Sequence, residues 1–317
     1  ENYSKHIQAK WPLTMLATST HDTKRGEDVR MRINVLSEIP DMWNEKVTDW
    51  CENNRKYHEA NLPDANTEYY FYQTLLGSWP ISEERITEHM IKAAREAKVH
   101  TAWKDENETY ENILTGFISD VLADDGFVKS LDEFVDKIKD PARVYSLGQT
   151  LIKFTSPGVP DTYQGSELWN MSLVDPDNRG EVDYEKRRNM LSKLEVMSPG
   201  EIMEEMESGL PKLYVTKKCL EVRNTLPEVF GEDSSFDKIE VTGKKKDHVI
   251  AFGRKKKVIT VVGRWLFKSD VGDTKVILPK GRWENVFTGE SFSGKTAVND
   301  LFRNFPVALL INEGEGK

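Results

Sequence analysis

The chain has few cysteines and no long run of apolar residues. Its 317 residues include two cysteines, Cys51 and Cys219, which lie far apart and fit neither a metal-binding spacing nor a disulfide framework. No apolar run approaches the roughly 20 residues that a membrane-spanning helix needs. We therefore predict no membrane segment and no metal site, and we expect both thiols to be buried or unreactive.

Basic residues are fewer than acidic residues. The 44 lysines and arginines are outnumbered by 53 aspartates and glutamates, which gives a net charge of −9 and a pI near 5.4. This balance argues against a nucleic-acid-binding protein, which would need a basic face. No targeting pattern is evident, so we expect a soluble cytoplasmic protein. Charged residues reach 31%, and many are lysine and glutamate, a bias reported for proteins from hot environments.

The segment of residues 18–30 places a His-Asp pair at the end of an apolar run. Residues 13–17 are mostly apolar and uncharged, as in a buried parallel strand. His21 and Asp22 follow, and a helix is predicted next because Val29, Ile33 and Leu36 recur at helical spacing. In a βα barrel, this strand-to-helix edge carries the chemistry. The alternative is structural, with the carboxylate capping the helix and the imidazole bonded to a backbone carbonyl.

Two further segments have distinctive amino-acid sequences. Residues 154–169 combine a short predicted strand with a Pro-Gly pair, and residues 174–184 form a polar loop. The segment 18–30 resembles the fourth signature region of the alpha-amylase superfamily of glycoside hydrolases, in the form found in maltooligosyltrehalose synthases. Residues 154–169 resemble the eighth barrel strand of that superfamily and its loop. Residues 174–184 are similar to a loop of the synthases, with Gly180–Glu181 in place of an Arg-Pro pair.

The resemblance implies an architecture that is α/β plus all-β. It begins only at the seventh strand of a (β/α)8 TIM barrel, so the six preceding units are expected outside this chain. With them would lie the family's nucleophilic aspartate and its acid/base glutamate, which makes the amino-terminal barrel portion an expected partner. We predict the last two barrel units with a helical insertion over residues 1–190, a helical connection over 191–225 and a β-sandwich domain over 226–317.

The resemblance also assigns site residues. Asp22 would be the third acidic residue of the catalytic set, binding hydroxyls of the sugar at the cleavage point, and His21 would donate to the same ring. Aromatic rings can stack on the apolar faces of glucose units. Further substrate contacts are expected from Lys24, Arg25, Tyr72, Trp79, Trp103, Lys104, Tyr163, Asp177 and Arg179.

Several of these residues have a structural alternative. Lys24 and Arg25 could solvate the loop and hold acidic neighbours. Tyr72 could belong to the core stripe of a helix, because it shares a helical face with other apolar side chains. Trp103, with Lys104, could pack on the surface.

The reaction that the resemblance implies is the conversion of maltodextrin to maltooligosyltrehalose, in trehalose biosynthesis. The α-1,4 bond at the reducing end is broken and an α,α-1,1 bond is formed by intramolecular transglycosylation, without metal or organic cofactor. Alternatives are another hydrolase or transglycosylase of the superfamily, and a non-catalytic glycan-binding or structural module. Because the nucleophile and the acid/base are expected elsewhere, the isolated chain is expected to be inactive.

Periodicity predicts the remaining elements. Helices are expected at residues 82–103, 110–122, 130–139 and 141–153, and charged helical segments continue to about residue 225. Beyond Pro227, short β-branched runs predict strands at residues 248–252, 258–262, 275–278, 283–287 and 307–311. Lysine clusters at residues 244–246 and 255–257 flank one of these strands and would protect a sheet edge.

Overall fold

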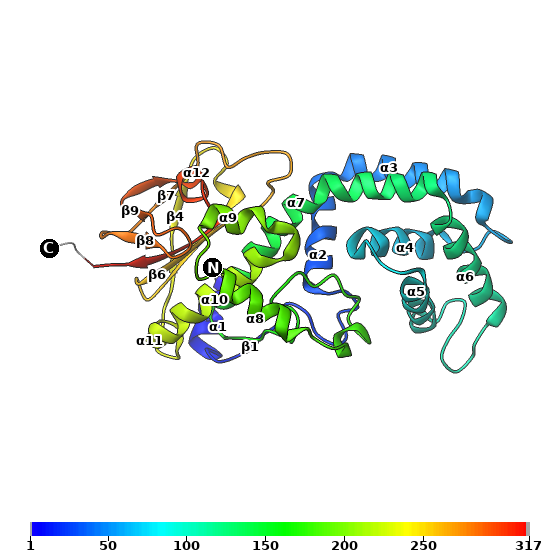
Figure 1. Cartoon of the computed structure of the whole chain (residues 1–317), viewed down its shortest axis with the longest axis horizontal. Helices are drawn as coiled ribbons and strands as arrows, with labels where there is room; N and C mark the ends of the chain where they lie inside the picture. Colours follow the sequence, from blue (N-terminus) through cyan, green and yellow to red (C-terminus); the bar gives the residue numbers. More distant parts are fainter. Residues whose placement is uncertain (1, 315–317) are drawn as a thin grey trace. The chain divides into compact units, whose positions relative to one another are not determined.

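The structure is a computed structural model that describes residues 2–314. The chain divides into two compact units. Unit 1 contains the residues up to Glu27, Arg143–Asn170 and the residues from Val174 onward, and unit 2 contains Asp28–Ala142 and Met171–Leu173. Among the described residues, every named strand belongs to unit 1 (Figure 1). The chain is therefore mixed helix and sheet, as predicted, while the domain boundaries at residues 190 and 225 stay predictions.

Unit 2 is built from helices packed around aromatic side chains. Its helices include α3 (Pro40–Asn54), α4 (Ala65–Ser78), α5 (Glu83–Ala97) and α6 (Glu108–Leu122). The ring of Trp50 lies 5.4 Å from that of Tyr72 and 5.3 Å from that of Phe127, measured between centroids. Buried aromatic rings share this core with aliphatic side chains such as Leu75 and Ile118.

Polar caps set where these helices begin. Asp64 accepts from the N–H groups of Asn66 and Thr67 at the start of α4, and Ser82 accepts from the N–H of Arg85 at the start of α5. These bonds satisfy backbone donors that the first helical turn leaves unpaired. The start predicted at Ser82 is confirmed. The helix ends at Ala97, before the predicted residue 103, because Lys98 adopts a left-handed φ of 57°.

The prediction of two helices on either side of residue 140 is wrong, because a single helix, α7 (Asp125–Thr155), spans both. It is one helix of 31 residues with Pro141 inside it. Proline lacks an N–H and clashes with the preceding turn, which is why its position suggested a break. Apolar residues nevertheless keep helical spacing through it and are buried: Leu131, Phe134, Val135, Ile138, Ala142 and Tyr145. Packing of this stripe outweighs the cost of the proline.

Unit 1 contains two antiparallel sheets. The larger has the strand order β3-β5-β6-β11-β8-β9, and the smaller has the order β10-β7-β4. The five predicted strands correspond to β5 (Val249–Arg254), β6 (Val258–Gly263), β7 (Lys275–Ile277), β8 (Trp283–Asn285) and β11 (Val307–Asn312). The others are β3 (Phe236–Lys238), β4 (Glu240–Thr242), β9 (Ser291–Phe292) and β10 (Lys295–Ala297).

The larger sheet is buried on both faces. Val258 and Val262 of β6 pack in a core shared with α7 and with α10 (Leu210–Thr225). Ile259 and Val261 point to the other face, where they share a second core with Val276 of the smaller sheet. Because side chains alternate along a strand, β6 is apolar at almost every position.

The third sheet is a short parallel pair. Strand β1 (Met15–Leu16) pairs with β2 (Val159–Pro160), with Met15 opposite Val159. The burial predicted for residues 13–17 is wrong for the described part of the chain, since Leu13 is 51% and Met15 67% exposed. Parallel strands are normally covered on both faces, and here β1 has β2 as its single strand partner among residues 2–314.

The described chain has further helices in both units. They are α1 (Asn2–Lys10), α2 (Glu27–Asn34), α8 (Tyr184–Lys193), α9 (Pro199–Glu204), α11 (Pro227–Phe230) and α12 (Val298–Leu301), with short 3-10 turns between some of them. The predicted end of the helical segments near residue 225 is confirmed by α10. Over residues 2–314, we find no helix with the length and apolarity to cross a membrane.

Candidate functional site

The loop between β1 and α2, residues 17–26, carries the predicted catalytic pair. The hydroxyl of Thr23 donates to the carbonyl of Thr20 at 2.9 Å, which closes a turn around the pair. Lys24 follows in a left-handed conformation with a φ of 64°. His21 and Asp22 are both exposed at this turn. Helix α2 begins at Glu27, so Asp22 lies outside the N-cap position of that helix.

His21 meets residues of the third motif segment. Its Nε2 atom lies 3.7 Å from Oδ2 of Asp175, and the Nη2 atom of Arg179 lies 2.9 Å from Oδ1 of the same carboxylate. The side chain of Asp175 is itself one-fifth exposed. Two site residues predicted from separate segments, His21 and Arg179, are thus brought together by a carboxylate that the sequence did not single out.

Glu27 was also missed, although its segment was singled out. Its carboxylate is buried and accepts a hydrogen bond from Nζ of Lys212 at 2.5 Å. The Nζ atom of Lys153 lies 3.7 Å from the same carboxylate, and the hydroxyl of Thr18 donates to it. Burial alone raises the pKa of Glu27, but the two lysines and the hydrogen bonds outweigh it, so the pKa lies below its usual value.

The other predicted residues of unit 1 lie in loops. Lys24 and Arg25 are half-buried beside the His-Asp turn. Tyr163 is exposed in the segment after β2, where its carbonyl accepts from the N–H and the hydroxyl of Ser166. Asp177 begins the short 3-10 helix Asp177–Arg179.

Tyr72 and Trp79 occupy different environments in unit 2. Tyr72 is completely buried, and its hydroxyl donates to Oε1 of Glu68 at 2.7 Å and accepts from Nδ2 of Asn54 at 2.9 Å. This is the core position that the structural alternative predicts, and it does not offer the ring to a sugar. Trp79 is half-buried, with Nε1 donating to Oδ1 of Asp132 at 2.6 Å.

Trp103 and Lys104 lie on the surface of unit 2. Both are exposed, and the guanidinium of Arg95 stands 5.0 Å from the ring centroid of Trp103. The same guanidinium is fixed by two carboxylates, because Nη2 lies 2.7 Å from Glu111 and Nη1 lies 2.9 Å from Glu106. The indole is therefore ordered by a surface ion-pair network, which is the packing alternative.

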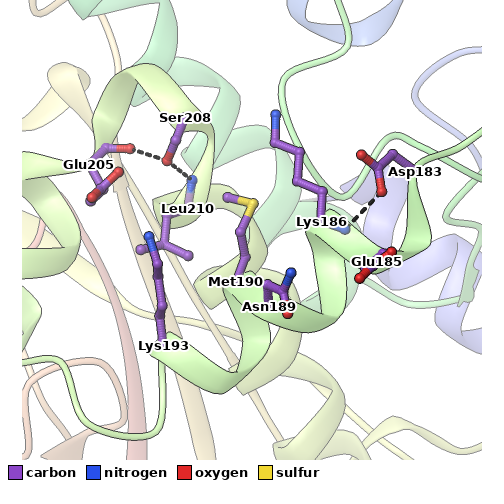
Figure 2. Close-up of a pocket in the computed structure, with 9 residues that line it drawn as sticks. All are labelled: Asp183, Glu185, Lys186, Asn189, Met190, Lys193, Glu205, Ser208 and Leu210. Carbon is purple, nitrogen blue, oxygen red and sulfur yellow. Dashed lines mark hydrogen bonds between the residues drawn. The ribbon is translucent and has the colours of Figure 1, made fainter.

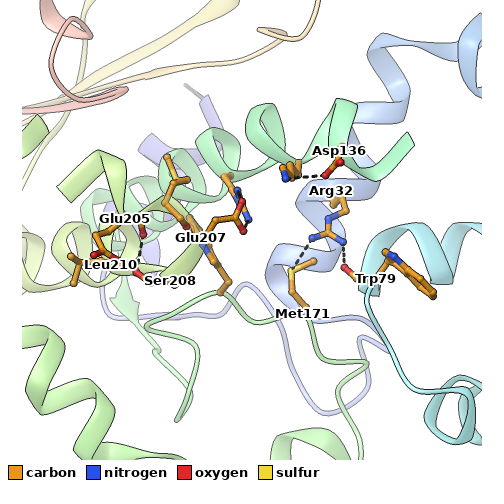
Figure 3. A network of polar contacts seen from close by, with 12 residues as sticks. Arg32, Trp79, Asp136, Met171, Glu205, Glu207, Ser208 and Leu210 are labelled. Atoms are coloured by element: carbon orange, nitrogen blue, oxygen red, sulfur yellow. Dashed lines mark hydrogen bonds and ion pairs between the residues drawn. The ribbon is translucent and has the colours of Figure 1, made fainter. Parts of the chain in front are cut away.

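Arg32 is a further buried cation that the sequence analysis missed. Its Nη1 atom donates to the carbonyl oxygen of Trp79 at 2.6 Å and to that of Leu76 at 3.3 Å. Its Nη2 atom points to the sulfur of Met171 at 3.9 Å (Figure 3). Arg32 thereby holds the segment that carries Trp79, within unit 2.

A surface hollow of about 430 Å³ lies in unit 1 between α8 and the start of α10. Figure 2 shows its mixed lining, with Asp183 accepting from the N–H of Lys186 and Ser208 donating to the carbonyl of Glu205. None of the predicted site residues is among its lining residues. The residues that line the hollow therefore do not include any residue of the His21–Asp22 loop.

The described residues offer no metal-binding group. We find no cluster of three His, Cys, Asp or Glu side chains that could hold an ion within residues 2–314. Burial and the neighbouring Glu68 raise the pKa of the Cys51 thiol to about 11, and burial raises that of Cys219. Both thiols stay protonated near neutral pH, which agrees with the unreactive thiols expected from the sequence.

Comparison with known proteins gives consistent matches. No family model matches the chain. A protein of Mycobacterium tuberculosis named "Putative maltooligosyl trehalose synthase" is 37% identical over 313 residues, which are 96% of this chain and 38% of that protein. The chain also matches the structure of maltooligosyltrehalose synthase from Arthrobacter ramosus, with a TM-score of 0.86, 30% identity, and coverage of 98% of this chain and 40% of that one.

A third match comes from Sulfolobus tokodaii, a hypothetical maltooligosyl trehalose synthase. It has a TM-score of 0.77 and 34% identity, covering 98% of this chain and 40% of that one. The chain therefore spans about two fifths of the length of the relatives that it matches. Because the identity and the fold extend over nearly all of its residues, the chain belongs to the maltooligosyltrehalose synthase family, of which it represents a carboxy-terminal part.

Proposed function

We propose that this chain contributes Asp22 to the active site of an enzyme that converts maltodextrin to maltooligosyltrehalose. The observation that carries the proposal is the parallel pairing of β1 with β2, directly before the loop that holds His21 and Asp22. Adjacent parallel strands that end in polar loops are the arrangement of the catalytic edge of a βα barrel. In this proposal, β1 and β2 are the seventh and eighth barrel strands.

Asp22 has the chemistry that the reaction needs from a third carboxylate. Cleavage of a glycosidic bond passes through a state in which the sugar ring acquires positive charge. An ionised carboxylate that accepts hydrogen bonds from ring hydroxyls gains strength as that charge develops, so it stabilises the transition state more than the ground state. His21, held beside Asp175, would donate to the same sugar.

The nucleophile and the acid/base would come from the rest of the polypeptide. Support comes from the exposed apolar side chains of the β1 region, where Trp11 is 64% exposed and Leu13 and Met15 are more than half exposed. Parallel barrel strands are covered on both faces in complete folds. We infer that the amino-terminal barrel portion pairs with β1 and β2 and covers these side chains.

The finer features of the predicted organisation belong to the same proposal. The two antiparallel sheets that share a core would form the β-sandwich domain that follows the barrel. Lys24, Arg25, Tyr163, Asp177 and Arg179 would contact substrate near Asp22, with Trp79, Trp103 and Lys104 as further candidates. A cytoplasmic location and a source from a hot environment stay predictions from composition.

The test is product formation from maltopentaose. The purified chain of residues 1–317 should give no turnover, and the complete polypeptide should give a trehalose-ended product. A free reducing sugar as the main product would instead favour a hydrolase of the same superfamily. Turnover by the isolated chain would refute the proposal that two catalytic carboxylates lie outside it.

A further inference from the structure

A single buried carboxylate joins both ends of the His21–Asp22 loop. Thr18 lies at the start of the loop and donates its hydroxyl to the carboxylate of Glu27, which ends the loop and begins α2. The loop between them, which includes His21 and Asp22, therefore spans two residues that are bonded to each other. This hydrogen bond closes the base of the loop and restricts the positions that the tip of the loop can reach.

The same carboxylate is fixed to two long helices. Oε1 of Glu27 lies 2.5 Å from Nζ of Lys212 in α10, and Oε2 lies 3.7 Å from Nζ of Lys153 in α7. Lys212 also donates to the carbonyl oxygen of Leu168 at 3.0 Å, in the segment that follows β2. The loops after β1 and β2 are thus tied to one lysine. Both lysine side chains are almost completely buried.

An ionic cluster of this kind is a weak source of stability. Removing charges from water costs much of what their attraction gains, so packed apolar residues would hold the same helices at least as well. What an apolar cluster lacks is direction, because a hydrogen-bonded ion pair fixes particular atoms of particular segments. In this cluster, the fixed atoms belong to the residues that bracket Asp22.

We propose that Glu27 and Lys212 are positioning residues for Asp22, which hold the loop of residues 17–26 in the geometry that the reaction requires. The inference rests on the proposed function, because it assigns the role of holding a catalytic side chain. It goes beyond that function because neither residue touches the sugar. The ion pair acts on the reaction through the loop alone.

Variants of the complete enzyme test this role. Glu27→Gln and Lys212→Met should each lower kcat by on the order of 100-fold, the cost of misplacing a reacting group by about 1 Å, with KM within about threefold of wild type. The double variant E27Q/K212M leaves Lys153 as the one cation of this cluster, whereas E27Q leaves two, so the double variant should unfold at a higher temperature than E27Q. It should keep the low kcat, which a purely structural role would not predict.

Arg254→Met is the matched control. Arg254 is a buried cation of unit 1 whose guanidinium donates to the carbonyl of Thr155 at 2.9 Å and to Gln8 at 2.6 Å. Its loss should lower Tm as Lys212→Met does, and kcat per folded molecule should stay within about twofold of wild type. An equal fall in kcat for R254M and K212M would overturn the positioning role.

Hydrogen exchange separates this inference from the proposed function. Amides of residues 18–27 should exchange faster in the E27Q enzyme than in wild type, and at an unchanged rate in R254M. Unchanged exchange in E27Q, or a wild-type kcat in the folded variant, would overturn the inference. If D22N keeps a near-normal kcat, the proposed function of Asp22 fails, whereas the exchange rates still decide whether Glu27 holds the loop.

Discussion

The Nζ atom of Lys212 lies 2.5 Å from Oε1 of Glu27, between residues that are 185 positions apart in the sequence. Both side chains are buried, and Lys153 lies close to the same carboxylate. Burial by itself would favour the protonated acid, but the two cations favour the carboxylate more, and the pKa of Glu27 is lowered.

This lowered pKa predicts how stability depends on pH. The contribution of ionised Glu27 is fully present above its unfolded pKa of about 4.3 and is lost as the pH falls through the lower folded pKa. The difference in unfolding free energy between wild type and E27Q should therefore be largest near neutral pH and should shrink below about pH 4. Urea unfolding at a series of pH values measures it, and a pH-independent difference would contradict the assignment.

Tyr72→Phe should destabilise the protein and leave substrate binding unchanged. The substitution removes a buried hydroxyl that donates to Glu68 at 2.7 Å and accepts from Asn54 at 2.9 Å. Leaving these partners unsatisfied should cost about 1–3 kcal/mol of unfolding free energy. Tyr184→Phe, at an exposed tyrosine, is the control and should change stability by less than about 0.5 kcal/mol. A raised KM in the complete Y72F enzyme, with stability unchanged, would instead support the predicted contact of Tyr72 with the substrate.

Two glycines in helices of unit 2 should respond in opposite directions to alanine. A Cβ at Gly77 of α4 would stand 2.7 Å from Cγ1 of Val29 and 2.9 Å from Cδ1 of Ile33. Gly77→Ala should therefore lower the unfolding free energy by about 1–3 kcal/mol through overpacking.

Gly116 of α6 provides the matched comparison, because a Cβ there meets no atom within 4 Å. Gly116→Ala should raise stability by about 0.5–1 kcal/mol, since alanine restricts the unfolded chain and favours the helix. Thermal unfolding of the two variants measures whether their stabilities change in these opposite directions. A stabilised G77A protein would show that the contact between α2 and α4 is looser than the structure indicates.

Much of the fold could be predicted from local patterns. The strand β6 is apolar along its length, and Ser82 caps α5 with a side chain recognisable in the sequence. Patterns failed where tertiary packing decides, as at Pro141, which a buried apolar stripe keeps inside one helix. They also missed the exposure of Met15, because an apolar run does not show which other segment, if any, covers its side chains.

The candidate site could be predicted in part. The segment that holds His21 and Asp22 is recognisable by its amino-acid sequence. The apolar run before it indicates that the segment follows a strand, which is β1 in the structure. The role of Glu27 could not be predicted, since an acidic residue at a helix start is usually explained by the helix dipole. Its partner Lys212 lies in a helix with several charged residues, and the neighbouring sequence does not indicate that this lysine is buried.

The most direct measurement of the central claim is the kcat of the complete enzyme with Asp22→Asn, on maltopentaose. Loss of a carboxylate that acts in the transition state should lower kcat by roughly 1,000-fold or more while maltodextrin still binds. Asp270→Asn, at an exposed surface ion pair with Lys245, should keep wild-type kcat. A D22N enzyme with near-normal kcat would contradict the account and remove Asp22 from the catalytic set.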